Sequence, residues 1–294
     1  MSYKTQLNLF LLPYLFGIFL LVIIPALLSF GIAFFRYDGL SAPVWVGNLN
    51  FILAYNDELF NLSIQNSVAL VLLPVPLRVF GAFLMARLLQ KNGRFLNAFR
   101  AIIFLPSIIP GAAYALAWIW IFNPLSGPLN LLLQSIGLFT PAWLADPLWA
   151  KPALALISLW QIGEGFIVSL AALSDMPPSI DEAAQIDGAS TWQQFWLIQL
   201  PIFAPILLIL IFRDIALTLQ NSFTTILFTT QGGPYYASYT LPQFIYEQGF
   251  DLLFFGSASA ALWVLYLITG LIILIVYLLA RQWQVGPSEA LYVL

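Results

Sequence analysis

Long apolar runs are the feature that most limits what this chain can fold into. A helix rises about 1.5 Å per residue, so about 20 apolar residues cross the roughly 30 Å hydrocarbon core of a bilayer. The sequence contains six runs of about that length. We expect each run to form a membrane-spanning helix, over the approximate ranges Leu9–Phe35, Ser67–Leu89, Ala101–Phe122, Pro152–Ser174, Pro201–Leu219 and Phe255–Ala280.

The composition agrees with a protein built in lipid. Of the 294 residues, 61% are hydrophobic and 8% are charged, whereas soluble domains have roughly 25% charged residues. The first run follows Lys4, but it is too long for a secretory signal and has no small-residue cleavage site, so we interpret it as a retained span. We predict an all-α integral membrane protein with six transmembrane helices. Its expected parts are a first helix and outer loop over 1–66, a core of five helices over 67–280, and a short cytoplasmic tail over 281–294.

Basic residues near the ends of the runs predict the orientation. Lysine and arginine gather on the cytoplasmic side of membrane proteins. With the N-terminus inside, Arg36 and Lys151 face out, and both termini and the connections Gln90–Arg100 and Asp175–Leu200 are cytoplasmic. The basic residues on the inner side are then Lys4, Arg87, Lys91, Arg94, Arg100 and Arg281.

Two missing residue types and the weak net charge exclude several kinds of function. The chain has no cysteine and no histidine, so it lacks thiol chemistry and the commonest metal ligand. A formal net charge of -3 does not favour a nucleic-acid partner. A phosphate-binding loop needs a Gly-Lys pair, but the lysines follow Tyr3, Gln90 and Ala150. We therefore expect no catalytic, metal or cofactor site in this chain.

The inner connection between the fourth and fifth runs has the pattern of a short helix. It follows the pair Pro177-Pro178, and Ser179 with Glu182 three residues later is a capping-box pattern. Gly188 is suited to the left-handed turn that ends a helix. Either Ser190 or Thr191 can cap a second segment, with Gln193 or Gln194 at the matching position, and Pro201 then opens the fifth span.

This connection resembles the signature loop of binding-protein-dependent ABC importer permeases. The matching positions are Glu182, Ala183, Ala184, Gly188, Ile198, Leu200 and Pro201, at the family spacing. The resemblance implies a type I ABC importer permease fold in which this loop is the coupling helix that docks on an ATP-binding subunit. It assigns ATPase coupling to Glu182, Ala183, Ala184, Asp187 and Gly188, with Ile198, Leu200 and Pro201 fixing the base of the loop. For Glu182, a role in capping its own helix is the alternative.

Other segments resemble the maltose and glycerol-phosphate permeases, of the first-subunit type. They are Phe122-Asn123-Pro124 after the third run and Gly232-Gly233-Pro234 after the fifth. The resemblance implies a bacterial inner-membrane protein that works with two ATP-binding subunits, a second homologous permease subunit and an extracytoplasmic solute-binding protein. ATP and Mg would be bound by the partner ATPase subunits.

Polar and aromatic side chains in the fourth and fifth spans are candidates for the path of the solute. A sugar needs hydrogen-bonding groups for its hydroxyls and an aromatic face for its C–H surface. We assign the path to Trp160, Glu164, Gln220, Asn221 and Phe223. Glu164 departs from the family pattern, and a salt bridge to Arg78 or Arg213 is its alternative role, unless Asp214 pairs with Arg213 instead.

Two other classes of function remain open at this point. An ion-coupled secondary transporter would use Glu164, Asp214 and Arg213 as a relay, but it leaves the inner loop unexplained. An ABC importer for a solute other than a sugar would look much the same in sequence. A membrane-embedded enzyme lacks a convergent catalytic set.

Overall fold

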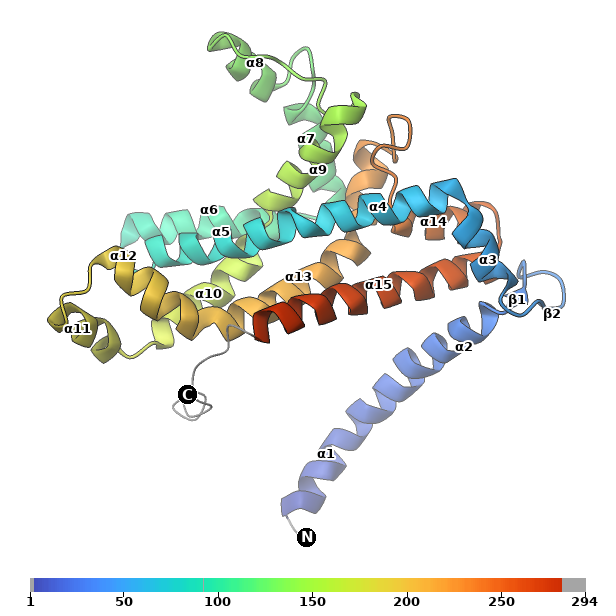
Figure 1. The fold of residues 1–294 in the computed structure, drawn as a ribbon, viewed down its shortest axis with the longest axis horizontal. Coiled ribbons are helices and arrows are strands. Elements are labelled where there is room, and N and C mark those ends of the chain that lie inside the picture. The colour runs from blue at the N-terminus through green and yellow to red at the C-terminus, as the bar shows by residue number, and fades with distance from the viewer. Residues whose placement is uncertain (1–2, 92, 282–294) are drawn as a thin grey trace. The chain divides into compact units, whose positions relative to one another are not determined.

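The computed structural model describes residues 3–91 and 93–281, and they are mostly helical (Figure 1). Within these ranges the strands are one short antiparallel pair, β1 (Phe35–Arg36) and β2 (Val44–Trp45), with Phe35 opposite Trp45. The expected all-α membrane fold is therefore confirmed. The helices are α1 (Tyr3–Ile18), α2 (Ile24–Ile32), α3 (Leu49–Asn56), α4 (Glu58–Leu72), α5 (Pro74–Leu88), α6 (Arg94–Ile108), α7 (Gly111–Ile121), α8 (Pro128–Ser135), α9 (Pro147–Trp160), α10 (Gly163–Asp175), α11 (Pro178–Ile186), α12 (Thr191–Gln193), α13 (Leu200–Thr229), α14 (Leu241–Tyr246) and α15 (Phe255–Arg281), with π-helical segments η1 (Phe19–Ile23), η2 (Gln194–Gln199) and η3 (Glu247–Asp251).

These elements supply the expected spans. Within the described residues, four helices are long and apolar enough to cross a membrane, and two bent helix pairs bring the total to six if each pair is one span. The four are Gln6–Ile32, Glu58–Leu88, Thr191–Thr229 and Phe255–Arg281, and the pairs are Arg94–Ile108 with Gly111–Ile121 and Pro147–Trp160 with Gly163–Asp175.

The chain forms two compact units. The first contains the residues through Ile64 together with Leu241–Leu267, and the second contains Gln65–Thr240 and the chain from Ile268 onward. In the first unit, the amide of Asn50 donates to the carbonyls of Ala33 and Phe35, at 2.8 and 2.9 Å. The first unit also contains Leu241–Leu267, which the expected division at residue 66 assigns to the core over 67–280.

The third span is broken more sharply than a kink. α6 and α7 are bent by 106°, and Pro110 stands at the break as the N-cap of α7. Ile109, before this proline, is extended with ψ 130°, because proline disfavours helical geometry in the residue that precedes it. The run Ala101–Phe122 is therefore two helices and not one.

The fifth span is longer than expected at both ends. α12, η2 and α13 form one continuous helical stretch, Thr191–Thr229, which passes through Pro201 without a break. Pro201 lies in the first turn of α13. Pro201 therefore opens α13 as expected, but the π segment η2 joins α13 to the loop, so the helical stretch begins before the proline.

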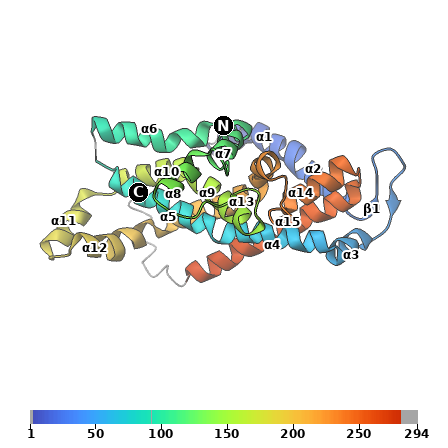
Figure 2. The ribbon, with the colours of Figure 1, turned by 90° about the horizontal axis from the view of Figure 1, so that it is seen from above.

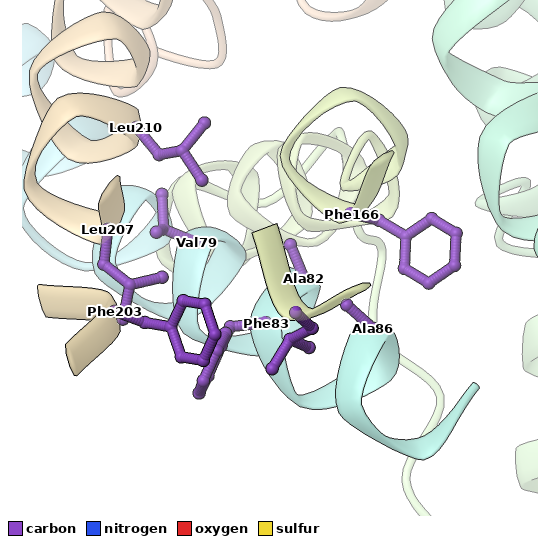
Figure 3. Packing of buried hydrophobic residues seen from close by; sticks show 9 residues of the cluster. Val79, Ala82, Phe83, Ala86, Phe166, Phe203, Leu207 and Leu210 are labelled. Atoms are coloured by element: carbon purple, nitrogen blue, oxygen red, sulfur yellow. The ribbon is translucent and has the colours of Figure 1, made fainter. Parts of the chain in front are cut away.

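The main core of the second unit lies where α5, α10 and α13 meet (Figure 3). Ala82 and Ala86 on α5 let the backbones approach closely, which is how helices pack in lipid. Phe83 and Phe166 are fully buried beside them. The other buried members of this cluster are Val79, Leu173, Phe203, Leu207 and Leu210.

Candidate functional site

The connection between α10 and α13 folds into the predicted short helix, α11. The helix begins at Pro178, where a missing N–H costs nothing, and its N-cap is Pro177, which makes no side-chain cap. Ser179 lies inside the first turn, so the predicted capping box of Ser179 and Glu182 is wrong. The Pro177-Pro178 pair moves the start of the helix ahead of the serine, and Glu182 loses the capping role that was its alternative.

The end of α11 follows the prediction. Gly188 is left-handed, with φ +77°. Its N–H donates to the carbonyl of Gln185 at 3.1 Å, and the N–H of Ala189 donates to the carbonyl of Ala184 at 2.9 Å. These two bonds form a Schellman motif, which satisfies the last carbonyls of the helix and turns the chain back.

Ser190 then caps the next segment. Its hydroxyl accepts from the N–H of Gln193 at 3.3 Å, and the side-chain oxygen of Gln193 accepts from the N–H of Ser190 at 2.8 Å. Of the two predicted caps, the structure selects Ser190. Figures 1 and 2 both show α11 and α12 side by side, joined by this tight turn.

α11 has an inner face and an outer face. Ala184 is 5% exposed, whereas Glu182, Ala183, Asp187 and Gly188 are exposed. Ile186 is an apolar side chain with 86% of its surface exposed at the end of the helix. Glu182 and Asp187 place two exposed carboxylates on α11, and the stretch Asp175–Leu200 has no basic residue, so the outer face of α11 suits a basic surface with a place for an apolar side chain.

The base of the loop is fixed by packing against the core. Phe195 and Leu200 pack against the α5–α10–α13 cluster, and the rings of Phe195 and Phe83 are 5.8 Å apart. Ile198 and Leu200 are half-buried, while Pro201 is exposed. Gln199, between the two predicted anchors, is 1% exposed and was not predicted as part of the site.

A cavity of about 410 Å³ lies in the second unit, between α5, α6, α9, α10 and α13. Arg78 on α5 is one of the residues that line the cavity, and three nitrogens of its guanidinium donate hydrogen bonds. Nε donates to Asp214 at 2.7 Å, Nη1 to the hydroxyl of Ser158 at 3.0 Å, and Nη2 to the hydroxyl of Thr218 at 2.8 Å. Arg78 and Asp214 have side-chain exposures of 11% and 10%, so this pair is largely desolvated.

A second charge pair lines the same cavity nearer to solvent. The guanidinium of Arg213 pairs with the carboxylate of Glu164 and also contacts Asp214 at 3.2 Å. Of the alternatives for Glu164, the pair with Arg213 is the one that forms, and Asp214 serves both arginines. The four charged residues that line the cavity are two acids and two bases, so their formal charges cancel.

The family match decides what kind of protein carries this loop and this cavity. Residues 78–284 match the family described as "Binding-protein-dependent transport system inner membrane component". The match spans more than half of the chain and includes the loop and all of the cavity lining except Leu70. The chain belongs to this permease family.

Relatives of the permease support the same assignment along nearly its whole length. It is 33% identical to the probable ABC transporter permease protein YesP of Bacillus subtilis, over 93% of this chain and 90% of YesP. It is 30% identical to the lactose transport system permease protein LacF of Rhizobium radiobacter, over 93% of both chains. A permease chain in the crystal structure of a bacterial alginate ABC transporter, solved with a pentasaccharide-bound periplasmic protein, shares its fold with a TM-score of 0.78 at 24% identity, over 97% of both chains.

The permease brings together part of the predicted solute path. Glu164 and Asn221 line the cavity. Trp160, Gln220 and Phe223 are not among the residues that line it; Trp160 is 57% exposed and meets Trp118 edge to face. Sequence reasoning did not place Arg78, Ser158, Asp214 and Thr218 on the path. Arg78 could have indicated this group, because it lies within an apolar run and a charged residue in a membrane span usually faces a cavity.

Proposed function

We propose that this permease forms part of the translocation path of an ATP-driven importer for a sugar or sugar-like solute. The observation that carries the proposal is α11, an acidic helix whose exposed face projects from a loop anchored in the membrane bundle. The permease would work with two ATP-binding subunits, which hold ATP and Mg, with a second homologous permease subunit, and with an extracytoplasmic solute-binding protein. We assign it to the bacterial inner membrane with both termini in the cytoplasm.

The chemistry of the cavity supports an uncharged, hydroxyl-rich solute. Ser158, Thr218 and Asn221 offer donors and acceptors of the kind that sugar hydroxyls use. The charged residues are already paired, which leaves no surplus positive charge to attract an anion. The relation to a lactose permease points the same way.

The proposed mechanism is alternating access driven from the loop. ATP-dependent closure of the ATPase pair would move α11, with Glu182, Ala183, Asp187 and Gly188 at the contact and Ala184 facing inward. Ile198, Leu200 and Pro201 lie in the continuous helical stretch Thr191–Thr229, and its α13 part forms one wall of the cavity. A displacement of the loop is thereby passed to the solute path without any bond being made or broken in the solute.

An ion-coupled secondary transporter is the alternative class, with Glu164, Asp214 and Arg213 as its relay. These residues are adjacent, but in this structure each carboxylate has an arginine partner. The acidic loop would have no role in such a protein. An importer for a solute other than a sugar keeps the loop and differs in what the cavity accepts.

Purification and uptake separate these functions. The permease should co-purify with ATP-binding subunits, and proteoliposomes of the whole complex with its binding protein should accumulate a labelled sugar from a panel that includes lactose when ATP is inside. Uptake by this chain alone, driven by an ion gradient, would reject the proposal. ATP-driven uptake of another solute, but of no sugar, would retain the importer and reject the substrate class.

A further inference from the structure

A buried amide links α11 to the membrane bundle. Gln199, the last residue of η2, has 1% of its surface exposed. Its side-chain oxygen accepts from Nε of Arg87 on α5 at 2.8 Å. Its side-chain nitrogen donates to Oδ1 of Asp181 on α11 at 3.0 Å. A glutamine this deep is uncommon, and both ends of its amide are used.

The chemistry of its neighbours fixes the orientation of this amide. A guanidinium can only donate and an ionised carboxylate can only accept. If the amide of Gln199 were flipped, its NH₂ would face the guanidinium of Arg87 and its oxygen would face the carboxylate of Asp181. The glutamine thus connects two opposite charges that do not touch each other, and neither charge is left unpaired in a half-buried place.

The connection continues beyond Arg87 to a third helix. Nη1 of Arg87 donates to the side-chain oxygen of Gln90 at 3.1 Å, and the side-chain nitrogen of Gln90 donates to the carbonyl of Leu173, near the end of α10, at 2.9 Å. α5 and α10 both contribute to the cavity wall. The polar chain therefore runs from α11 through the start of the fifth span to two helices that enclose the cavity.

We infer that Gln199 is a positioning residue that makes α5 and α10 follow the movement of α11. The inference rests on the proposed docking of α11 on an ATPase. Packing of Phe195 and Leu200 holds the loop on the core, but apolar contacts are non-directional and do not fix the position of one helix relative to another. Directional hydrogen bonds from Gln199 fix which part of α11 moves with α5, and the face that carries Glu182 stays free for the partner.

Charge substitution in the Gln199 amide tests the link without removing volume. Gln199→Glu places a carboxylate against Asp181 and keeps the bond to Arg87. Asp181→Asn in the same chain supplies a donor for the new carboxylate and restores every hydrogen bond. Gln6→Glu adds the same charge at an exposed position of α1, outside α11, and is the matched control. Because the chain has no native cysteine, Ser222→Cys in the cavity lining can report on access in all variants.

The measurement uses the whole complex in proteoliposomes, with ATP, vanadate and a small thiol reagent as probes. In the parent complex, trapping with ATP and vanadate should change the rate at which the cysteine at 222 reacts. Gln199→Glu should reduce that change at least about fivefold while ATPase subunits still co-purify and hydrolyse ATP. The Asp181→Asn, Gln199→Glu double variant should recover it, and Gln6→Glu should match the parent.

Two results would overturn the inference. One is an unchanged response of the cysteine in Gln199→Glu, and the other is a double variant that does not recover. If Gln199→Glu does not assemble, the double variant alone decides, since recovery of both assembly and response supports the link and failure rejects it. A parent complex that does not bind an ATPase would instead reject the proposed function. The inference about Gln199 would then be rejected as well, because it rests on that function.

Discussion

Nε of Arg78 on α5 lies 2.7 Å from Oδ2 of Asp214 on α13, with both side chains about nine-tenths shielded from solvent. The pair joins two of the three helices that form the main core, in the wall of the cavity. Removing one partner of such a pair is costly because the other charge stays buried and alone. The pair is thus a structural tie at the site where a solute would pass.

Truncation of one partner should therefore destabilise the permease strongly. We expect Asp214→Ala to lower the free energy of unfolding by about 3 kcal/mol, visible as a lower Tm in detergent by tryptophan fluorescence. The Arg78→Met, Asp214→Leu double variant should be more stable than Asp214→Ala, since no charge is left over. Equal Tm values for the parent and Asp214→Ala would show that the ion pair contributes nothing.

Glu182 gives a second prediction, because it is exposed and does not take part in a capping box. Glu182→Gln should leave the Tm unchanged and weaken the ATPase contact by about 1 kcal/mol or more, the usual scale for losing a charge at an interface. ATPase activity that depends on the solute-binding protein checks this. Asp175→Asn, at the end of α10 rather than on α11, is the control and should behave like the parent.

Gly188 gives a third prediction, which separates backbone geometry from space. A Cβ at Gly188 would meet nothing within 4 Å, yet its φ of +77° strains most side chains. We expect Gly188→Ala to destabilise the end of α11 by about 1 kcal/mol, with faster hydrogen exchange in residues 183–189 and less co-purified ATPase. Gly188→Asn should be milder, since asparagine tolerates the left-handed region. Identical exchange in the alanine and asparagine variants would contradict this account.

Gly163, at the start of α10, gives a fourth prediction that concerns space alone. A Cβ there would lie 2.9 Å from Cα of Phe104 on α6, and backbone atoms cannot move aside cheaply. We expect Gly163→Ala to cost about 2 kcal/mol through overpacking. Gly81→Ala on α5 is the matched control, since a Cβ at Gly81 meets nothing within 4 Å. Thermal unfolding of the two variants should separate them clearly, and a shared Tm would count against close packing of α6 on α10.

The sequence reveals most of this fold because lipid makes strong demands on composition. Apolar length alone predicts six spans, and the structure has helices for all of them. Local chemistry is predictable where one residue has one good solution, as with the left-handed Gly188, whereas the sequence left the next cap open between Ser190 and Thr191. The Ser179 capping box failed because two adjacent prolines offer a competing start for the same helix.

The cavity was less predictable, because its members come from helices far apart in the chain. Arg78 and Asp214 are 136 positions apart, and no periodicity says that they meet. Aromatic side chains such as Trp160 and Phe223 looked suitable by type, but their position on the helix decides what they face. Gln199 was missed because it lies between recognised anchor residues and has no charge to draw attention.

The π segment η2 (Gln194–Gln199) sets the rotational phase between the loop and the fifth span. A π turn accommodates one residue more than an α turn, so it shifts every residue on one side relative to those on the other. Deleting a single residue here would turn α11 by about 100° around the axis of α13 and draw it in by about 1.5 Å. The number of residues in this segment, and not only their identity, therefore aims the acidic face of the loop.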